Sequence, residues 1–325
     1  TSSLEELFLD PGFYWSWERF ADRWENVFGY PVEDLKPVNV DIMEMYDSIV
    51  CVNLKTSFMK SEQFIKVTNS EYFAPLLMVN QFGSKDVFEQ VPAVDMFAHL
   101  SNWLMRPVPT VTAAVRRFKE RYFEDNYVIG LEMELSSASD LGTMPAAQQQ
   151  LFFQEASDAS HRAASNLGPN QQGIVVLVVT DDEAALRSRL ADLGQDSLGA
   201  AGVVAITGPR GYGTDRLLTE LQQAWLLGYA DICIVSPASA TGILGHARTS
   251  LSPIVIVDGQ TAHQATSSQP CLADVGLIQH AKCFVPGMLS HVNYDPNVPC
   301  LGTTQPSTVA ESDRLRRARH MQIEL

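Results

Sequence analysis

The sequence has few basic residues and lacks any long apolar run. Lysine and arginine together number 23 against 38 aspartate and glutamate residues, which gives a formal net charge of -15 at pH 7. Because so negative a chain repels a phosphate backbone, we expect no nucleic-acid partner, and any bound anion needs a local pocket. No apolar stretch approaches the roughly 18 to 20 residues that cross a bilayer, so we also expect no membrane span in this chain.

Cysteine is also scarce, and no N-x-S/T glycosylation signal occurs. The five cysteines are Cys51, Cys233, Cys271, Cys283 and Cys300. Their spacing lacks the short pairs of a structural zinc site, so we expect no metal and regard all but Cys233 as candidate disulfide partners in an oxidising compartment. Cys233 lies in an apolar run and is expected to be a small core residue. The chain opens on Thr1 without a basic, apolar leader, and we expect a processed or truncated N-terminus.

The sequence does contain a series of apolar runs of strand length. They alternate with helical patterns and lie at residues 128–135, 173–180, 202–207, 231–236 and 253–258. The runs are continuous, as is typical of strands that are covered on both faces. One of the helices between them is expected to begin after Asp181, as N-cap, and to end at Gly194. This order predicts an α/β fold with a doubly wound parallel sheet.

The rest of the chain follows other patterns. Residues 1–125 are rich in aromatic residues and helical patterns, with one good strand at residues 63–67, too few for a sheet of their own. We therefore predict a partial, helix-rich N-terminal lobe over residues 1–125 and a Rossmann-like C-terminal lobe over residues 126–259. Residues 260–325 show little periodicity and are expected to form a cysteine-bearing extension that packs across the lobes.

One junction combines an apolar strand with small, hydroxyl-bearing residues. The segment ADICIVSPASATG, residues 230–242, passes from the strand into Ser236, Ser239, Thr241 and Gly242. In open parallel sheets, ligands lie beyond the carboxyl ends of the strands, where the next helix directs unpaired amide groups at them. Two interpretations stay open. Either the hydroxyls and the glycine hold a diphosphate, or the small residues let the next helix pack tightly against the sheet.

The junction resembles the plant xyloglucan fucosyltransferase family. In that family the strand is followed by a Ser-x-x-Ser-Thr-Phe-Gly turn that forms part of the GDP-fucose site. Ser236, Ser239 and Gly242 match this turn, whereas Ala238 stands where the family has tryptophan and Thr241 where it has phenylalanine. The resemblance implies that Ser236, Ser239, Thr241 and Gly242 are donor-binding residues.

Further segments resemble the same family in the same order along the chain. They are QFIKVTNSEYFAPLL at residues 63–77, FAHLSNWLMRPVPTV at residues 97–111 and VIGLEMEL at residues 128–135. Together with the junction they extend over nearly the whole chain. The resemblance implies a two-lobed glycosyltransferase fold of the GT-B type, whose N-terminal lobe is truncated here.

Three departures from the family's pattern bear on function. Glu134 stands where the family has an arginine that reaches the donor diphosphate, and two like charges about 4 Å apart repel by roughly 4 kcal/mol at an effective dielectric constant of about 20. Ser70 replaces an acidic residue, which leaves Glu71 as the nearest candidate base. The family's Gly-Leu-Gly-Asn-Arg turn has no counterpart and is expected upstream of Thr1. We therefore predict a degenerate donor site.

Two functions stay open on this basis. We favour a non-catalytic binding or structural component of a larger assembly, without a cofactor and with other protein subunits or a glycan as partners. The alternative is an inverting fucosyltransferase that moves fucose from GDP-fucose to a cell-surface or cell-wall glycan, with Glu71 as the base. Both imply the secretory pathway, in the Golgi lumen, or the extracellular space.

Three other features have structural explanations that we favour. Asp181 and Asp182 follow a predicted strand, where helix capping explains them as well as a ribose or metal contact does. His246 lies one turn into the helix after the junction and is expected to be a satisfied core histidine rather than a crevice residue. The loop at residues 206–215 fits no phosphate-loop pattern, because Thr214 occupies the position of the lysine.

Overall fold

The computed structural model of the protein describes part of the 325-residue chain. The described residues are 4–9, 17–29, 31, 38–41, 65–68, 96–135, 144–168, 171–193, 198–200, 202–208, 213–236, 239–257 and 259–265. Their helices are α1 (Leu4–Leu7), α2 (Trp17–Phe28), α7 (Met96–Leu104), α8 (Pro109–Tyr122), α9 (Ala146–Ala164), α10 (Glu183–Leu193), α11 (Thr214–Leu227) and α12 (Ala240–Ala247). Their strands are β1 (Val38–Asp41), β2 (Ile65–Thr68), β3 (Asn126–Met133), β4 (Gly173–Thr180), β5 (Gly202–Thr207), β6 (Ile232–Val235), β7 (Ile254–Ile256) and β8 (Ala262–Gln264).

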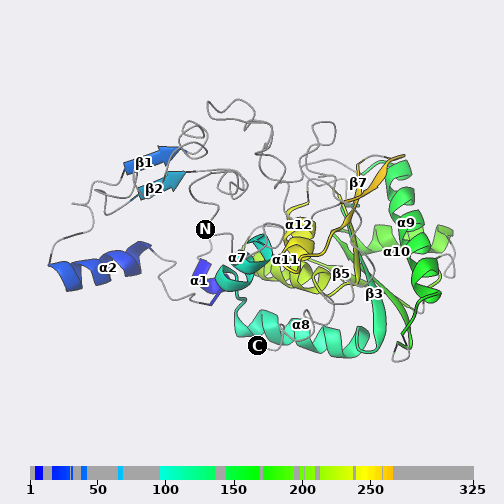
Figure 1. The fold of residues 1–325 in the computed structure, drawn as a ribbon, viewed down its shortest axis with the longest axis horizontal. Coiled ribbons are helices and arrows are strands. Elements are labelled where there is room, and N and C mark those ends of the chain that lie inside the picture. The colour runs from blue at the N-terminus through cyan, green and yellow to red at the C-terminus, as the bar shows by residue number, and fades with distance from the viewer. Residues whose placement is uncertain are drawn as a thin grey trace, which may run out of the picture.

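A six-stranded sheet organises the C-terminal half of the described chain (Figure 1). Its strand order is β5-β4-β3-β6-β7-β8, and every neighbouring pair is parallel except β7 and β8. The chain runs outward from β3 through β4 to β5 and then returns to β6 on the other side of β3. The predicted parallel α/β sheet is confirmed. The order reverses between β3 and β6, which is where ligands bind in sheets of this kind.

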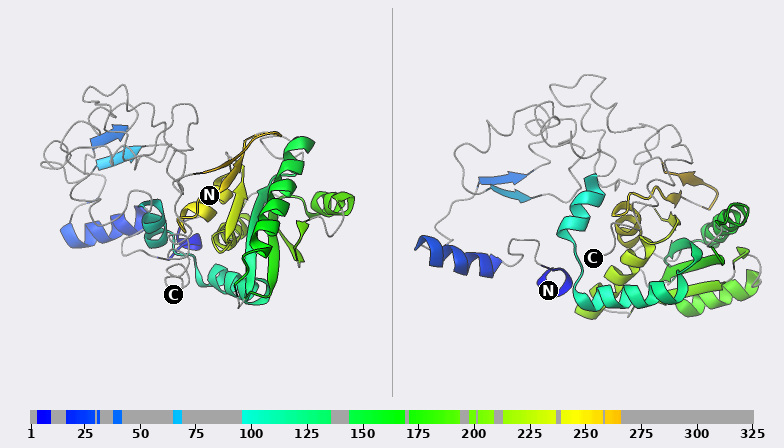
Figure 2. Two further views of the ribbon diagram at one scale, coloured as in Figure 1. Left: turned by 45° about the vertical axis from the view of Figure 1, so that its right-hand side comes forward. Right: turned by 60° about the horizontal axis from the view of Figure 1, so that its bottom comes forward.

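Helices cover both faces of this sheet, as the continuous apolar runs require. Ile129, Leu131 and Met133 of β3 point to one face and pack in a cluster with residues of α9 and α10. Val128, which alternates with them, packs on the other face in a cluster with residues of α8 and α11. Figure 2 shows these two helical layers on opposite sides of the strands. No described helix has the length and apolar character needed to cross a bilayer.

The N-terminal segment contributes to the second of these layers. Leu7 and Phe8 are buried in the cluster that contains α8 and α11, and Phe8 forms an antiparallel bridge with Pro107. The Thr214 hydroxyl at the start of α11 donates to the Glu6 carboxylate at 2.9 Å. Residues assigned to the N-terminal lobe from the sequence thus complete the packing beneath the C-terminal sheet, and the lobe boundaries stay a prediction.

Two short strand pairings were not predicted. β1 pairs in parallel with β2, the strand expected at residues 63–67, and Val38 lies opposite Ile65. β8 pairs antiparallel with β7 at the edge of the large sheet, so part of the expected extension belongs to the sheet. Each of these strands has only three or four residues, too few to stand out as a pattern.

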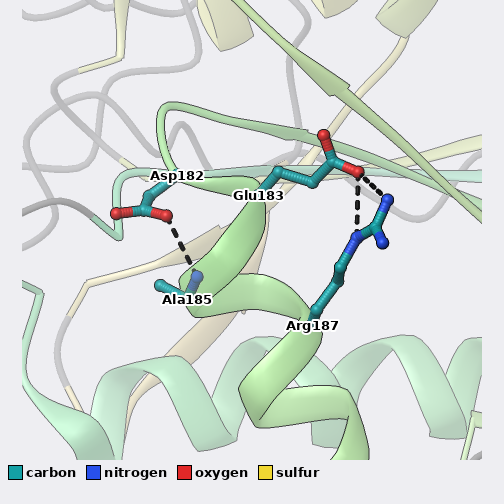
Figure 3. Close-up of polar contacts among 4 residues, drawn as sticks. All are labelled: Asp182, Glu183, Ala185 and Arg187. Atoms are coloured by element: carbon teal, nitrogen blue, oxygen red, sulfur yellow. Dashed lines mark hydrogen bonds and ion pairs between the residues drawn. The ribbon is translucent and has the colours of Figure 1, made fainter.

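Two aspartates tie the end of β4 to its surroundings. The Ala185 amide donates to Asp182 Oδ1 at 3.0 Å, so Asp182 caps the start of α10 (Figure 3). Asp181 instead accepts the Leu135 amide at 2.7 Å and holds the end of β3. The expected N-cap at Asp181 is therefore wrong by one residue. In the first turn of α10, the Arg187 Nε donates to Glu183 at 3.0 Å, which forms an exposed ion pair.

A buried arginine joins three helices. Arg248 is 3% exposed, and its guanidinium lies 4.5 Å from the centre of the Trp225 ring. Its Nη2 donates to the Trp225 carbonyl at 3.2 Å, and Asn102 of α7 donates its Nδ2 to the Arg248 carbonyl at 2.9 Å. Gly228 makes room for the guanidinium, since a Cβ there would meet Arg248 Nε at 2.9 Å. Arg248 therefore fixes α7 against α11 and the end of α12.

Candidate functional site

The candidate site lies at the carboxyl ends of β3 and β6, where the strand order reverses. The two strands pair in parallel, with Ile129 opposite Ile232 and Leu131 opposite Ile234. Glu132 follows in β3, and Ser236 follows the end of β6. Helix α12 then begins at Ala240. We call Glu132, Ser236, Ser239 and Gly242 the β6–α12 junction.

Ser239 is the N-cap of α12. Its backbone is extended, with φ -76° and ψ 113°, and its hydroxyl oxygen accepts the Gly242 amide at 2.9 Å. Its carbonyl accepts the Ile243 amide at 2.9 Å, the first hydrogen bond of the helix. Serine is among the preferred residues at this position because its side chain satisfies an amide that the helix leaves open. Ser239 is 5% exposed, so the cap is buried.

Gly242 allows α12 to lie directly on the sheet. A Cβ at this position would meet Val235 Cγ1 at 2.9 Å and Val235 Cβ at 3.1 Å. Gly245, one turn later, is just as close to α11, since its Cβ would meet Leu227 Cβ at 2.7 Å. The structure thus supports the packing interpretation of these small residues. A contact of Gly242 with a donor stays a prediction.

The carboxylate of the junction is Glu132, which the sequence analysis missed. Glu132 is 5% exposed, and the Ser236 hydroxyl donates to its Oε2 at 3.3 Å. The Ser239 hydroxyl and the Ser236 amide also form hydrogen bonds with it. Residues of a strand alternate between faces, so Glu132 shares its face with Val128. The sequence shows this alternation, but it does not show that β3 lies next to β6, so the sequence alone does not single out Glu132.

The environment of Glu132 favours its uncharged form. The pKa of its carboxyl is raised from 4.5 to about 7. Burial is the largest cause and the charge of Glu134 acts in the same direction, whereas the hydrogen bonds from Ser239 and Ser236 lower the pKa. Burial and the neighbouring Glu132 likewise raise the pKa of the Cys233 thiol well above its usual range. A carboxyl group that titrates near neutral pH therefore lies beside a thiol that stays neutral.

The other predicted site residues are placed as follows. Glu134 is half-buried and close enough for its charge to act on Glu132, and Thr241 is half-buried in the first turn of α12. Cys233 is a free, buried thiol, as predicted. Glu71 and Ala238 lie outside the described residues, as do Cys51, Cys271, Cys283 and Cys300. Across the part of the chain that the structure describes, no group of histidine, cysteine, aspartate or glutamate is suited to a metal ion.

His246 is a structural residue, as predicted. It is 4% exposed, and its Nδ1 lies 3.1 Å from the Leu251 carbonyl oxygen. A carbonyl only accepts, so Nδ1 carries the proton. Burial lowers the pKa of the imidazole from 6.5 to about 4, and His246 is neutral at physiological pH.

The fold of the chain resembles that of a solved fucosyltransferase structure. No protein-family model matches the chain, and neither does any curated protein. The first similar structure is a mutant of Arabidopsis thaliana FUT1 in complex with GDP, with a TM-score of 0.56 and 16% identity over 82% of this chain and 66% of that chain. Fucosyltransferase NodZ from Bradyrhizobium has a TM-score of 0.37 and 14% identity over 76% of this chain and 70% of that one. NodZ alpha-1,6-fucosyltransferase co-crystallized with GDP has a TM-score of 0.34 and 18% identity, over 49% and 48%.

The fold is that of a glycosyltransferase of the GT-B type, as the sequence resemblance implies. Within that class, the likeness is to the fucosyltransferase FUT1 of Arabidopsis thaliana, the match with the highest TM-score of these three. The chain spans 66% of the length of the FUT1 structure. At 16% identity, this likeness shows the fold alone.

Proposed function

We propose that this protein uses a glycosyltransferase scaffold without transferring a sugar from a nucleotide donor, and that it acts as a binding or structural component of a larger assembly. One observation supports the proposal. Ser236 and Ser239, the two serines expected to hold a donor diphosphate, both form hydrogen bonds with the buried Glu132. The site that would receive a diphosphate thus already contains an acidic group of the chain itself.

The size of the electrostatic penalty supports the same reading. Two unit charges of like sign about 4 Å apart repel by roughly 4 kcal/mol at an effective dielectric constant of about 20. Since about 1.4 kcal/mol corresponds to a tenfold change in affinity, a Glu132 that stayed charged would weaken diphosphate binding by roughly a thousandfold. Because the pKa of Glu132 is about 7, the group can be protonated instead, which limits the penalty at pH 7.5 to about fourfold. Glu134, which directly follows β3, adds a second acidic group whose charge acts on Glu132.

Thermal denaturation with GDP tests this proposal directly. A site with a micromolar dissociation constant would stabilise the fold by about 4 kcal/mol in millimolar GDP. We expect no measurable shift of the wild-type chain at pH 7.5, and no release of GDP from GDP-fucose in the presence of glycan acceptors. A shift together with acceptor-dependent GDP release would overturn the proposal.

A fucosyltransferase is the second candidate, because FUT1, solved with GDP, has this fold. In that case the donor would bind at Ser236, Ser239, Thr241 and Gly242, and Glu71 would be the base that activates a glycan hydroxyl. The decisive variant is Glu71→Gln. This candidate requires acceptor-dependent GDP release by the wild-type chain, with a kcat that falls at least a hundredfold in the variant while KM for the donor is retained.

The cysteines and the family resemblance support a place in the secretory pathway or outside the cell, with protein subunits or a glycan as partners. Alkylation of the denatured chain, before and after reduction, tests the oxidising environment. Two disulfides among the four cysteines other than Cys233 leave one free thiol per chain before reduction. Five free thiols in protein taken from its native compartment would contradict this localisation.

A further inference from the structure

We propose that α8 and the end of α11 form a docking surface for an acidic segment of a protein partner. The surface consists of Arg116 and Lys119 of α8, Tyr229 just after α11, and the buried Arg248 next to Tyr229. We call it the α8 basic surface. This inference rests on the proposed function, because it names the kind of partner through which the chain joins an assembly.

Tyr229 lies among three cations. The Lys119 Nζ lies 4.7 Å from the centre of the Tyr229 ring, and the Arg248 Cζ lies 5.8 Å from it. Burial raises the pKa of the Tyr229 hydroxyl, while the charges of Arg248 and Arg116 lower it, so both guanidinium groups are close enough to act on this hydroxyl. Arg116 is exposed, and Lys119 and Tyr229 are half-buried. A partner can therefore reach two of the cations and the tyrosine.

The two outer cations are not paired with acidic groups of the described chain. On α11, Arg216 pairs with Glu220, one turn later, at 2.6 Å. Arg116 has Glu120 at the same spacing, yet neither Arg116 nor Lys119 forms an ion pair with any described residue. Positive charge thus stays available on this side of α8, although the formal net charge of the chain is -15.

The buried Arg248 adds a charge that the described residues do not balance. It is 3% exposed, and burial lowers its pKa from 12.5 to about 10, so the guanidinium is charged at neutral pH. Its hydrogen bonds go to neutral groups, the Trp225 carbonyl at 3.2 Å and the Asn102 side chain at 3.4 Å. Its Nε has no hydrogen-bond partner among the described residues. A buried charge without a counter-ion is costly, and a partner carboxylate beside Tyr229 reduces that cost.

The exposed groups fit an acidic protein segment. Arginine pairs with carboxylates through two parallel hydrogen bonds, and tyrosine and arginine are enriched at protein–protein interfaces. Arg116 and Lys119 are three residues apart in α8, so their Cβ atoms lie about 5–6 Å from each other, which suits two neighbouring acidic side chains. Lys119 lies over the Tyr229 ring, and this face of the ring is therefore not open for stacking on a sugar.

Fluorescence anisotropy with a labelled octaglutamate peptide and the full chain tests the α8 basic surface. We expect binding in 50 mM salt that weakens as the salt rises to 500 mM, because exposed charges are screened. In the double variant Arg116→Glu, Lys119→Glu the affinity should fall at least about tenfold. Each exposed ion pair contributes up to about fivefold, and both pairs are replaced by repulsion.

The double variant Arg117→Glu, Arg121→Glu is the matched control. It makes the same change of charge in the same helix, but successive residues of a helix point about 100° apart, so both exposed arginines lie on another side of α8. Its affinity for octaglutamate should stay within about threefold of the wild type. Equal losses in the two double variants, or no binding to the wild type, would overturn the docking surface. Arg116→Glu alone, at an exposed position, keeps the test valid if its double variant does not fold.

Two further measurements decide what kind of partner binds. An oligosaccharide of uronic acids with the same number of carboxylates should bind more weakly than octaglutamate, and tighter binding would overturn a protein partner in favour of an acidic glycan. Self-association of the wild type in sedimentation, abolished by Arg116→Glu, would overturn it in favour of a second copy of this chain. Sugar transfer from GDP-fucose would refute the proposed function, whereas these affinities refute only the docking surface.

Discussion

Replacing Glu132 by glutamine should stabilise the fold at neutral and alkaline pH. Burial raises the pKa of this carboxyl from 4.5 to about 7 in the folded chain, so the folded state holds the proton more tightly than the unfolded state. At about 1.36 kcal/mol for each pH unit, this difference amounts to roughly 3 kcal/mol. The wild type has this stability in full below pH 4.5, loses it as the pH rises to about 7, and lacks it above that pH. Glutamine has no charge to bury, so the variant keeps this stability at every pH.

The titration of His246 changes folding stability with pH in the opposite direction. The stability of the variant and of the wild type therefore has to be compared at each pH. Burial lowers the pKa of His246 from 6.5 to about 4 in the folded chain. Its contribution to stability is complete above pH 6.5 and is lost as the pH falls toward 4. The two effects overlap between pH 4.5 and 6.5 and partly cancel in the wild type. The difference between Glu132→Gln and wild type at each pH removes the histidine contribution, because both proteins contain it.

Urea denaturation at intervals from pH 4.5 to pH 8.5 measures this difference. We expect nearly equal free energies of unfolding at pH 4.5 and a variant that is more stable by roughly 3 kcal/mol at pH 8. Glu183→Gln is a suitable control, because the Glu183–Arg187 pair is exposed and its loss should change stability by less than about 1 kcal/mol. A Glu132→Gln variant that parallels the wild type at every pH, or is less stable at pH 8, would refute the reasoning.

Three further substitutions test the packing of the sheet and its helices, all by urea denaturation. Gly242→Ala should destabilise the fold by about 1–3 kcal/mol, since its Cβ would meet Val235 at 2.9 Å, whereas Gly202→Ala, with no atom within 4 Å, should not show this steric cost. Asp182→Ala should lose about 1 kcal/mol of helix capping, and Asp182→Asn should retain it. Arg248→Ala should cost about 2 kcal/mol or more through lost packing and ring contact, and unchanged stability would refute its role in fixing α7.

The large sheet was predictable because its strands are continuous apolar runs. β4, β5, β6 and β7 each fall within a run that the sequence shows without any partner, and β3 begins two residues before its run at residues 128–135. β1, with the sequence VNVD, pairs with β2, which lies farther along the chain. β8, with the sequence AHQ, pairs with β7 across a turn. Such short strands are fixed by tertiary contacts rather than by their own pattern. The shift of the α10 cap from Asp181 to Asp182 lies within the usual uncertainty of helix ends.

The candidate site was predictable in its location but not in its chemistry. The small, hydroxyl-bearing segment after β6 correctly indicated the junction where α12 begins. The resemblance drew attention to Glu134, since that position differs from the family in charge. Burial and a contact to Ser236 distinguish Glu132, and both depend on where β6 lies relative to β3. Likewise, the close contact between Gly242 and Val235 cannot be predicted from the sequence.

The close seating of α12 on β6 has a consequence for engineering this scaffold. Gly242 and Gly245 fix the position of the helix, while the acidic group comes from another element, β3. Shape and charge are thus encoded by different residues. The charge at this junction can therefore be altered by exchanging one strand side chain, without changing the glycines that seat the helix.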